Sequence, residues 1–405
     1  MSRNCLVAQS GGPTAAINSS LAGVISAALK SSLIKKVYGS RNGIQGVLEE
    51  RLSLLNDIFN QEENIVKLQS TPSMYLGSCR YKLTDYHKDP SDYDKICEIL
   101  TKYDIGYFFY IGGNDSMDTV AKLSSYTKDK GMDVKVIGVP KTIDNDLFCI
   151  DHTPGFGSAA KYIATSVLEM AHDTYIYAID TVLIVEIMGR NAGWLTAASS
   201  LARTSYSEAP HLIYLPEREF DKADFVKRVS ELLKEKHHVI VAVSEGIKDR
   251  DGNYISAQGG KVDKFGHVML SGTGKVLEQI VAEEIGCKVR SVELNVLQRA
   301  ASHVASKTDI EESFELGVNA VKLSMEGKSG VMSTLNRVSD EPYRVVFGEA
   351  DINQVANFEK KIPAEWITED GCDVTKEMET YLRPLIQGEN PVHYEKGIPE
   401  YLFME

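Results

Sequence analysis

The chain has 405 residues, which is enough for two or more domains of ordinary size. Hydrophobic residues make up 43% and charged residues 25%, so the composition excludes a disordered or fibrous chain. The formal net charge of −13 disfavours nucleic acid as a partner. Any anionic ligand must therefore be held locally, by a few cationic side chains, backbone N–H groups or a metal ion.

The expected compartment is the cytosol, with no membrane contact. No stretch reaches the roughly 20 apolar residues that a membrane helix needs. The apolar run near the N-terminus is too short for the core of a signal peptide. The six cysteines are scattered without a C-x-x-C pair, which predicts reduced thiols and no structural zinc.

Apolar runs of strand length alternate with helical patterns along the chain. The predicted strands are, in order, Leu6–Ala8, Tyr107–Ile111, Val134–Val139, Val182–Ile187, Leu212–Leu215 and Val239–Val243. Apolar helix faces are predicted at Ile17, Leu21, Val24, Ile25 and Ala28, at Ile163, Val167 and Met170, and at Phe225, Val229, Leu232 and Leu233. Such alternation predicts an α/β fold with a parallel sheet flanked by helices.

Unusual polar and glycine residues follow many of these strands. In doubly wound folds, ligands bind beyond the carboxyl ends of the strands. The segments at these positions are Ser10–Thr14, Gly112–Ser116, Pro140–Asp146, Met188–Arg190 and Ser244–Gly246. The sequence therefore predicts a ligand site built from strand-end loops.

The glycine-rich segments alone indicate little about the ligand. Gly11 and Gly12 would let backbone N–H groups approach a phosphate, but a tight strand-to-helix turn explains them equally well. The string Gly272–Lys275 lacks the spacing of a nucleotide P-loop. Asp115 could face a ligand, although capping the following helix is the more common role of such a residue.

The cluster Asp144-Asn145-Asp146 is more informative, because folding alone seldom places two acids directly after a buried strand. One carboxylate could take a proton from a hydroxyl while the other helps to place Mg²⁺, as phosphoryl transfer requires. The alternative is an Asx-turn that satisfies local backbone groups.

Several cations near strand ends could bind phosphate groups, with surface salt bridges as the alternative: Lys141, Arg190, Arg290 and Arg299. Glu245 could accept hydrogen bonds from sugar hydroxyls or stabilise a helix start. Together these residues indicate a phosphate-handling α/β enzyme. The residues by themselves do not identify the sugar.

The ordered motifs resemble those of the 6-phosphofructokinases over about residues 1–330. They are Ser10-Gly11-Gly12, Gly112-Gly113-x-Asp115-Ser116, Pro140–Asp146, Met188–Trp194 and Glu245-Gly246. The resemblance implies the phosphofructokinase fold, with two doubly wound, Rossmann-like domains around parallel sheets. We expect a phosphoryl-donor domain at 1–155 plus 298–345, a sugar-phosphate domain at 156–297 and a C-terminal extension at 346–405.

The same resemblance assigns roles to individual residues. Asp144 corresponds to the general base. The implied sugar-phosphate contacts are Thr142, Ile143, Asp144, Met188, Gly189, Arg190, Glu245, Arg290, Val296 and Arg299, with Arg290 reaching a neighbouring subunit in ATP-using relatives. Gly12, Arg80 and Lys141 correspond to contacts of the phosphoryl donor, and Asn114, Asp144 and Asp146 to the Mg²⁺ site.

The resemblance also indicates the phosphoryl donor. ATP-using relatives carry glycine at the positions of Asp115 and Lys141. A carboxylate at the first position would repel the α-phosphate of a nucleotide, and an ammonium at the second can stabilise a departing phosphate. We therefore expect Mg²⁺-pyrophosphate as donor to fructose 6-phosphate, in a reversible reaction of glycolysis and gluconeogenesis. The alternatives are an ATP-dependent enzyme and a non-catalytic regulatory subunit.

This chain departs from the family pattern at several positions. Asn114 replaces an aspartate credited with Mg²⁺. Val296 replaces a histidine that contacts the sugar phosphate, which leaves sedoheptulose 7-phosphate open as a further substrate. Ala22 and Ser26 replace effector-binding arginines, so we expect no allosteric control at that site. The family also implies a homodimer or homotetramer.

Overall fold

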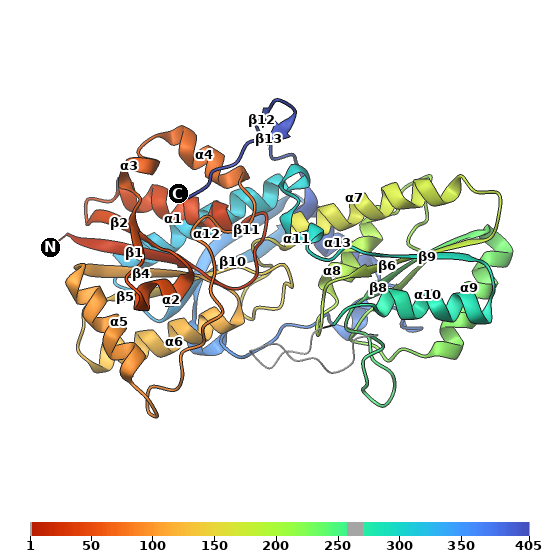
Figure 1. The fold of residues 1–405 in the computed structure, drawn as a ribbon, viewed down its shortest axis with the longest axis horizontal. Coiled ribbons are helices and arrows are strands. Elements are labelled where there is room, and N and C mark those ends of the chain that lie inside the picture. The colour runs from red at the N-terminus through yellow and green to blue at the C-terminus, as the bar shows by residue number, and fades with distance from the viewer. Residues whose placement is uncertain (1, 257–269, 405) are drawn as a thin grey trace. The chain divides into compact units, whose positions relative to one another are not determined.

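The computed structural model describes residues 2–256 and 270–404. The chain divides into two compact units, and Figure 1 shows the helices and strands of each. Unit 1 comprises Met1–Ser158, Arg299–Glu359 and Gln387–Glu405, and unit 2 comprises Ala159–Gln298 and Lys360–Ile386. Among the described helices, none is long and apolar enough to cross a lipid bilayer.

Unit 1 is built on a seven-stranded sheet with the order β11-β10-β5-β4-β1-β2-β3. The central strands are parallel, whereas β3 and β11 run antiparallel to their neighbours at the two edges. The strands are β1 (Arg3–Gln9), β2 (Ile34–Ser40), β3 (Leu52–Leu54), β4 (Ile105–Gly112), β5 (Lys135–Pro140), β10 (Val331–Asp340) and β11 (Tyr343–Asp351).

Helices cover both faces of this sheet, so the central strands are apolar along almost their whole length, as in most parallel sheets. The helices are α1 (Ile17–Lys30), α2 (Gly43–Leu48), α3 (Asn56–Phe59), α4 (Glu62–Ser70), α5 (Ser91–Lys102), α6 (Asn114–Asp129) and α12 (Lys307–Met325). One core joins the sheet to α1, α4 and α12, and the other joins it to α2, α5 and α6.

Two glycines allow α1 and α12 to pack closely. A Cβ atom on Gly23 would lie 2.0 Å from the carbonyl oxygen of Phe314, and one on Gly317 would lie 2.2 Å from that of Ser20. Both contacts are far inside van der Waals distance, so only glycine fits at either position. This close pair fixes α12 against the first helix of the unit.

Unit 2 contains a four-stranded parallel sheet with the order β7-β8-β6-β9. Its strands are β6 (Thr181–Ile187), β7 (Leu212–Tyr214), β8 (His238–Ser244) and β9 (Lys288–Glu293). Its helices are α7 (Phe156–Tyr175), which begins in unit 1, α8 (Trp194–Ala197), α9 (Lys222–Lys236), α10 (Thr273–Glu284), α11 (Leu297–Ala300), which ends in unit 1, and α13 (Lys376–Leu382).

The remaining regular elements are short. A small hairpin joins β12 (Tyr394–Glu395) to β13 (Ile398–Pro399). Turns of 3₁₀ helix lie at Ala198–Ala202, Ser302–Val304, Ile352–Gln354, Ala364–Trp366 and Arg383–Ile386.

The predicted α/β class is confirmed, and each predicted strand coincides with an observed one. The domain boundaries differ from the expected ones. Residues 346–405 do not form one extension: 346–359 and 387–405 belong to unit 1, and 360–386 belong to unit 2. The physical reason is that β11 pairs antiparallel with β10 at the edge of the large sheet, which ties this segment to unit 1.

Candidate functional site

In unit 1, the loops after β1, β4 and β5 lie side by side, because these strands are neighbours in the sheet. Glycines shape the first two loops. Gly11 has a φ of +83°, a conformation that residues with a Cβ rarely adopt. A Cβ on Gly112 would lie 1.9 Å from the hydroxyl oxygen of Ser116, so glycine lets α6 begin directly at the strand end.

Lys141 is the charged residue at the centre of these loops. Its side chain is only 3% exposed, and its Nζ donates a hydrogen bond of 2.9 Å to the carbonyl oxygen of Gly12. Burial lowers the pKa of Lys141 to about 8, although the nearby carboxylates of Asp144 and Asp146 oppose this effect. The structure thus keeps an ammonium with little hydration next to the glycine loop, where an anion would stabilise its charged form.

The carboxylate of Asp144 is held by its own loop. The hydroxyl of Thr142 donates a hydrogen bond of 3.1 Å to Asp144 Oδ2, and the backbone N–H of Asp144 donates to the same hydroxyl oxygen at 3.2 Å. Asn145 has a left-handed backbone with a φ of 54°, and its Oδ1 accepts the N–H of Thr153 at 3.0 Å. This turn leaves Asp144 partly exposed while Asn145 is buried.

Two arginines complete the cationic part of the unit 1 site. The Nη1 atom of Arg299 lies 3.3 Å from the position that a Cβ on Gly12 would occupy. Burial lowers the pKa of Arg299, nearby Arg80 lowers it further, and Asp144 opposes both effects. The resemblance implies that Arg299 contacts the sugar phosphate, and in the structure Arg299 lies beside Gly12 and near Arg80, two residues expected to contact pyrophosphate.

The start of α6 carries the other two predicted residues of this unit. Asp115 is exposed and forms an ion pair of 3.3 Å with Lys82. Asn114 instead bonds to the segment that follows β11: its Nδ2 donates to the carbonyl oxygen of Phe358 at 2.5 Å, and its Oδ1 accepts the N–H of Asn357 at 2.7 Å. Both ends of the Asn114 amide are thus used in holding this segment.

In unit 2, the loops after β6 and β8 meet where the backbone of Gly189 bonds to two side chains of the second loop. The N–H of Gly189 donates to Glu245 Oε1 at 3.3 Å, and the hydroxyl of Ser244 donates to the carbonyl oxygen of Gly189 at 2.5 Å. A Cβ on Gly246 would lie 1.9 Å from the carbonyl oxygen of Arg190, so glycine is required for this contact. Met188–Arg190 and Glu245 therefore form one cluster, as predicted strand-end neighbours should.

Arg290 lies away from the unit 2 loops, whereas Val296 lies in the segment that follows β9. Arg290 pairs with Leu183 in the middle of the sheet and extends from the edge strand β9, where its Nη1 lies 3.8 Å from a carboxylate oxygen of Asp173. Val296 is 50% exposed. The segment that carries Val296 runs beside the loop after β6, because Gln298 Oε1 accepts the N–H of Met188 at 3.3 Å.

Comparison with known protein families supports the resemblance that the strand-end motifs indicate. A phosphofructokinase family model matches residues 4–324, which includes every motif described above. The chain belongs to the phosphofructokinase family.

Full-length relatives of this phosphofructokinase carry one recurring name. Proteins named pyrophosphate--fructose 6-phosphate 1-phosphotransferase from Halomonas elongata and Xanthomonas campestris are 42% and 44% identical to it, over 98% and 99% of this chain and 95% and 96% of their own lengths. The crystal structure of a pyrophosphate-dependent phosphofructokinase from Nitrosospira multiformis is 41% identical, with a TM-score of 0.90 over 99% of this chain and 96% of its own.

A more distant relative of this phosphofructokinase has a different name. A protein named sulfofructose kinase, from Alkalicoccus urumqiensis, is 32% identical over 90% of this chain and 91% of its own length. Membership of the family therefore does not by itself identify which acidic group the sugar substrate carries.

The oxygen atoms near Lys141 fit a magnesium site in part. Asp144 and Asp146 are carboxylates, the hard oxygen ligands that Mg²⁺ prefers, and enzymes of this kind usually supply one or two of them while substrate phosphates and water complete the shell. Over the described ranges 2–256 and 270–404, no group of three or more His, Cys, Asp or Glu side chains is arranged around one metal position. The residues therefore suit a metal that arrives with a phosphate ligand.

Sequence reasoning missed the start of α10 as part of the unit 2 cluster. The hydroxyl of Thr273 donates to the carbonyl oxygen of Glu245 at 3.0 Å, and the N–H of Gly274 donates to the buried carboxylate of Glu186 at 2.7 Å. Burial raises the pKa of Glu186 to about 7. Glu186 lies two positions before Met188. An acidic residue inside an apolar strand is unusual, and this signal could have indicated this part of the cluster from the sequence.

Proposed function

We propose that this phosphofructokinase transfers a phosphoryl group from inorganic pyrophosphate to the 1-hydroxyl of fructose 6-phosphate. The observation that carries the proposal is the buried ammonium of Lys141, which lies against the glycine loop, while the backbone of Lys141 bonds to Gly112 at the strand end from which the helix with Asp115 starts. The names of the full-length relatives support the same donor and acceptor.

In the proposed reaction, Asp144 accepts the proton of the 1-hydroxyl, aided by the hydrogen bond with Thr142 that orients its carboxylate. The hydroxyl oxygen then forms a bond to the distal phosphorus of pyrophosphate, and the bond from that phosphorus to the bridging oxygen breaks. The leaving phosphate keeps the electron pair of that bond, and Lys141 stabilises its charge. If Mg²⁺ is bound, Asp146 would hold it, with Asp144 contributing directly or through water, and the ion would supply further charge neutralisation on the phosphate oxygens.

Donor choice follows from charge and space at two positions. Pyrophosphate needs room only for two phosphates, and Lys141 fills the space next to Gly11, where a Cβ would lie 3.0 Å from its Nζ. A nucleotide would have to extend further, past the carboxylate of Asp115, which repels its α-phosphate. Arg80 and Arg299 supply the positive charge that a dianionic or trianionic donor requires.

The test is the initial rate of fructose 1,6-bisphosphate formation with Mg²⁺ and either pyrophosphate or ATP. We expect turnover with pyrophosphate and none above background with ATP. The variant Asp115→Gly combined with Lys141→Gly should lose most pyrophosphate activity, because the leaving phosphate is no longer stabilised. Turnover of the wild-type enzyme with ATP alone would contradict the proposed donor, and turnover with neither would contradict the proposed acceptor or favour a regulatory subunit.

The sugar phosphate is assigned to the unit 2 cluster of Met188, Gly189, Arg190 and Glu245, with Arg290 contributed to a neighbouring subunit. Because Val296 cannot donate a hydrogen bond where relatives have histidine, we include sedoheptulose 7-phosphate as a further substrate. Comparing kcat/KM for fructose 6-phosphate, sedoheptulose 7-phosphate and 6-deoxy-6-sulfofructose tests the acceptor. Preference for the sulfonate would replace the phosphate assignment.

We further infer a reversible, Mg²⁺-dependent enzyme that works in the cytosol as a homodimer or homotetramer. The described cysteines are all free thiols, which suits a reducing compartment. The exposed position of Arg290 on an edge strand suits a contact with a second copy of the chain. Light scattering gives the subunit number, and a monomer with full activity would contradict the shared site.

A further inference from the structure

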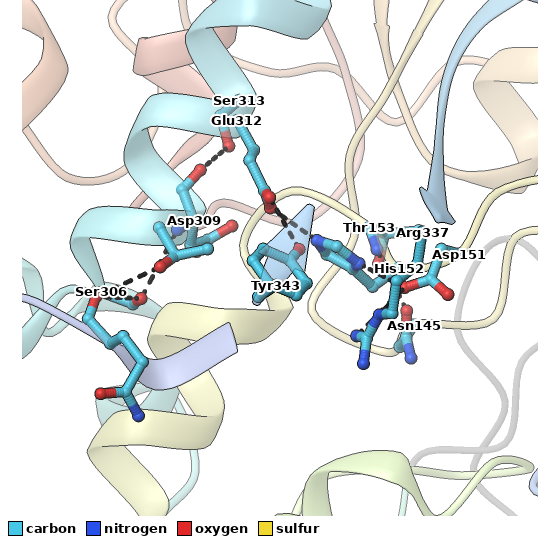
Figure 2. Close-up of polar contacts among 12 residues, drawn as sticks. Asn145, Asp151, His152, Thr153, Ser306, Asp309, Glu312, Ser313, Arg337 and Tyr343 are labelled. Atoms are coloured by element: carbon cyan, nitrogen blue, oxygen red, sulfur yellow. Dashed lines mark hydrogen bonds and ion pairs between the residues drawn. The ribbon is translucent and has the colours of Figure 1, made fainter. Parts of the chain in front are cut away.

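A buried histidine lies in the loop between the Asp144 turn and helix α7. His152 is 3% exposed, and each of its ring nitrogens meets a carboxylate, as Figure 2 shows. Nδ1 lies 2.7 Å from Asp151 Oδ2, and Nε2 lies 2.7 Å from Glu312 Oε2. The imidazole therefore bridges its own loop to helix α12.

Further side chains hold both carboxylates. The hydroxyl of Tyr343 on β11 donates to Glu312 Oε1 at 2.7 Å, and Nε of Arg337 on β10 donates to Asp151 Oδ2 at 3.2 Å. Arg337 is almost completely buried as well, and its guanidinium lies over the ring of Tyr343. His152 is thus the centre of a network that joins the loop to α12, β10 and β11 (Figure 2).

The residue after His152 connects this network to the Asp144 turn. The N–H of Thr153 donates to Asn145 Oδ1 at 3.0 Å, and its hydroxyl donates to the carbonyl oxygen of Thr142 at 2.6 Å. The side chain of Thr142 in turn bonds to the carboxylate of Asp144. A continuous series of short hydrogen bonds and peptide bonds therefore runs from His152 to Asp144.

A second anchor holds the end of the same loop. Asp309 on α12 is 3% exposed, and its carboxylate accepts the N–H of Gly155 at 2.8 Å and that of Ser158 at 2.9 Å. The loop is therefore fixed to α12 at both His152 and Gly155. Attachment at these two points leaves little freedom for Thr153, which lies between them and bonds to the Asp144 turn.

Burying several ionisable groups together is costly, and well-packed apolar side chains of similar volume often stabilise a core as much. We propose that His152 is a positioning residue of the phosphoryl-transfer reaction: by bridging Asp151 and Glu312, it fixes the loop whose Thr153 holds Thr142 and Asn145, and so sets the direction of the Asp144 carboxylate. The inference rests on the proposed role of Asp144 as general base.

The charges around His152 favour its protonated form. Burial lowers the pKa of His152, but the hydrogen bonds to Asp151 and Glu312 outweigh burial and raise the pKa above its usual value. The other ionisable groups near the ring are Arg337, Tyr343 and Asp309, and burial raises the pKa of Tyr343 and of Asp309. Because the folded-state pKa is raised above 6.5, the stabilisation from the imidazolium bridge is fully present below pH 6.5 and is lost as pH rises through the raised pKa.

The test uses His152→Gln, which keeps a hydrogen-bonding side chain but cannot bridge both carboxylates with a charged ring. We expect kcat to fall about 10- to 100-fold, since a misplaced base slows the chemical step, while the KM values for both substrates change less than threefold. His211→Asn is the matched control: Nδ1 of His211 accepts the N–H of Ile240 at 3.0 Å in unit 2, so its loss should affect stability and leave kcat unchanged.

A double-mutant cycle separates positioning from a general structural role. In an Asp144→Ala background, His152→Gln should cause no further loss of the residual rate, because the group that His152 positions is absent. Equal losses in both backgrounds, or wild-type kcat in folded His152→Gln, would overturn the inference. Tyr343→Phe, which removes only the distant hydroxyl, should give a smaller fall in kcat and decides the question if His152→Gln does not fold.

The outcomes also separate this inference from the proposed function. Full activity of Asp144→Ala would remove the general base and the inference with it. An inactive Asp144→Ala enzyme together with an unaffected His152→Gln enzyme would leave the proposed function intact and reject only the role of His152.

Discussion

The two units prepare their predicted sites in different ways. In unit 1, the central cation is withdrawn from water: Lys141 is 3% exposed, and partial burial also lowers the pKa of Arg299. In unit 2, the loops after β6 and β8 are joined by hydrogen bonds between the backbone of Gly189 and the side chains of Ser244 and Glu245, and by a close contact at Gly246. From this difference we expect unit 1 to contribute mainly charge stabilisation during the reaction, and unit 2 to contribute mainly the shape of the sugar-phosphate site.

The two arrangements have different costs. A buried ammonium has lost favourable hydration, and a bound anion compensates for that loss. It therefore interacts more strongly with a phosphate than an exposed lysine would. Backbone groups and glycines carry no net charge and lose little on burial when they are hydrogen-bonded. Substitutions in unit 1 should therefore affect kcat, and substitutions in the unit 2 loops should affect KM for the sugar phosphate.

The largest effect is expected for Asp144→Ala in unit 1. Loss of the general base should lower kcat roughly 10²- to 10⁴-fold while the protein remains folded, because the carboxylate is partly exposed and Asp146 still lies near the buried ammonium of Lys141. Steady-state kinetics and circular dichroism give the two quantities. Asp129→Ala, at the exposed end of α6, is the control, and activity in Asp144→Ala close to that of the control would contradict the mechanism.

Lys141→Met should lower kcat with pyrophosphate by about 10²-fold, because the leaving phosphate loses its buried cation. The same substitution should not lower the stability of the folded protein and should raise it at neutral pH. The folded-state pKa of Lys141, about 8, lies below the usual value of 10.5, so the charged amine destabilises the folded state at neutral pH and this penalty fades as pH rises through that interval.

Thermal unfolding at pH 7 therefore checks this prediction, and Lys141→Met should melt no lower than the wild-type enzyme. The matched control is Lys135→Met, at the other end of the same strand, where the ammonium is paired with Asp133 at 2.9 Å and lies far from the loops. Equal loss of kcat in both variants would indicate that β5 is merely disturbed.

Gly246→Ala tests the role of unit 2. The new methyl group would overlap the carbonyl oxygen of Arg190 and displace the Met188–Arg190 loop, so KM for fructose 6-phosphate should rise about tenfold with a smaller change in kcat. Gly348→Ala in β11 is the control, since the nearest atom there, Thr334 Oγ1, is 3.4 Å from the added Cβ. A fall in kcat at unchanged KM would contradict the division between the units.

The smallest effect is expected for Glu186→Gln. The pKa of Glu186 is raised from 4.5 to about 7 by burial, so its carboxyl stabilises the fold when protonated and this contribution is lost as pH rises through that interval. The glutamine amide is neutral at every pH. From pH 5 to pH 8, the melting temperature of the variant should therefore fall by a few degrees less than that of the wild-type enzyme. Glu235→Gln on exposed α9 should leave the pH dependence unchanged.

Sequence patterns predicted the buried central strands well, because strands covered on both faces are continuously apolar and flanked by turn residues. The same reasoning missed β2 and β10. In β2 the exposed Lys35 and Lys36 interrupt the apolar run, and β10 is buried in its first half only. Edge and half-exposed strands are specified by their partners in the sheet, which a local pattern does not reveal.

The site was predicted unevenly for a similar reason. The order of strand-end motifs was enough to group Gly12, Lys141 and Asp144, because parallel strands bring their ends together. The bonds from Asn114 to Asn357 and Phe358, and from His152 to Glu312, join residues far apart in sequence. A local pattern contains no information about such partners, so these contacts required the three-dimensional structure.

The interleaved path of the chain has a consequence for biosynthesis. The chain changes unit after Ser158, Gln298, Glu359 and Ile386, so neither unit is a continuous stretch of sequence. During translation, β10 and β11 reach the large sheet of unit 1 only after nearly all of unit 2 has been made, and unit 2 itself still awaits residues 360–386. Proteins built from consecutive domains can fold one domain at a time on the ribosome. Here, both units gain further segments only after residue 359 has been made, which makes a nascent chain of this enzyme dependent on protection from aggregation until then.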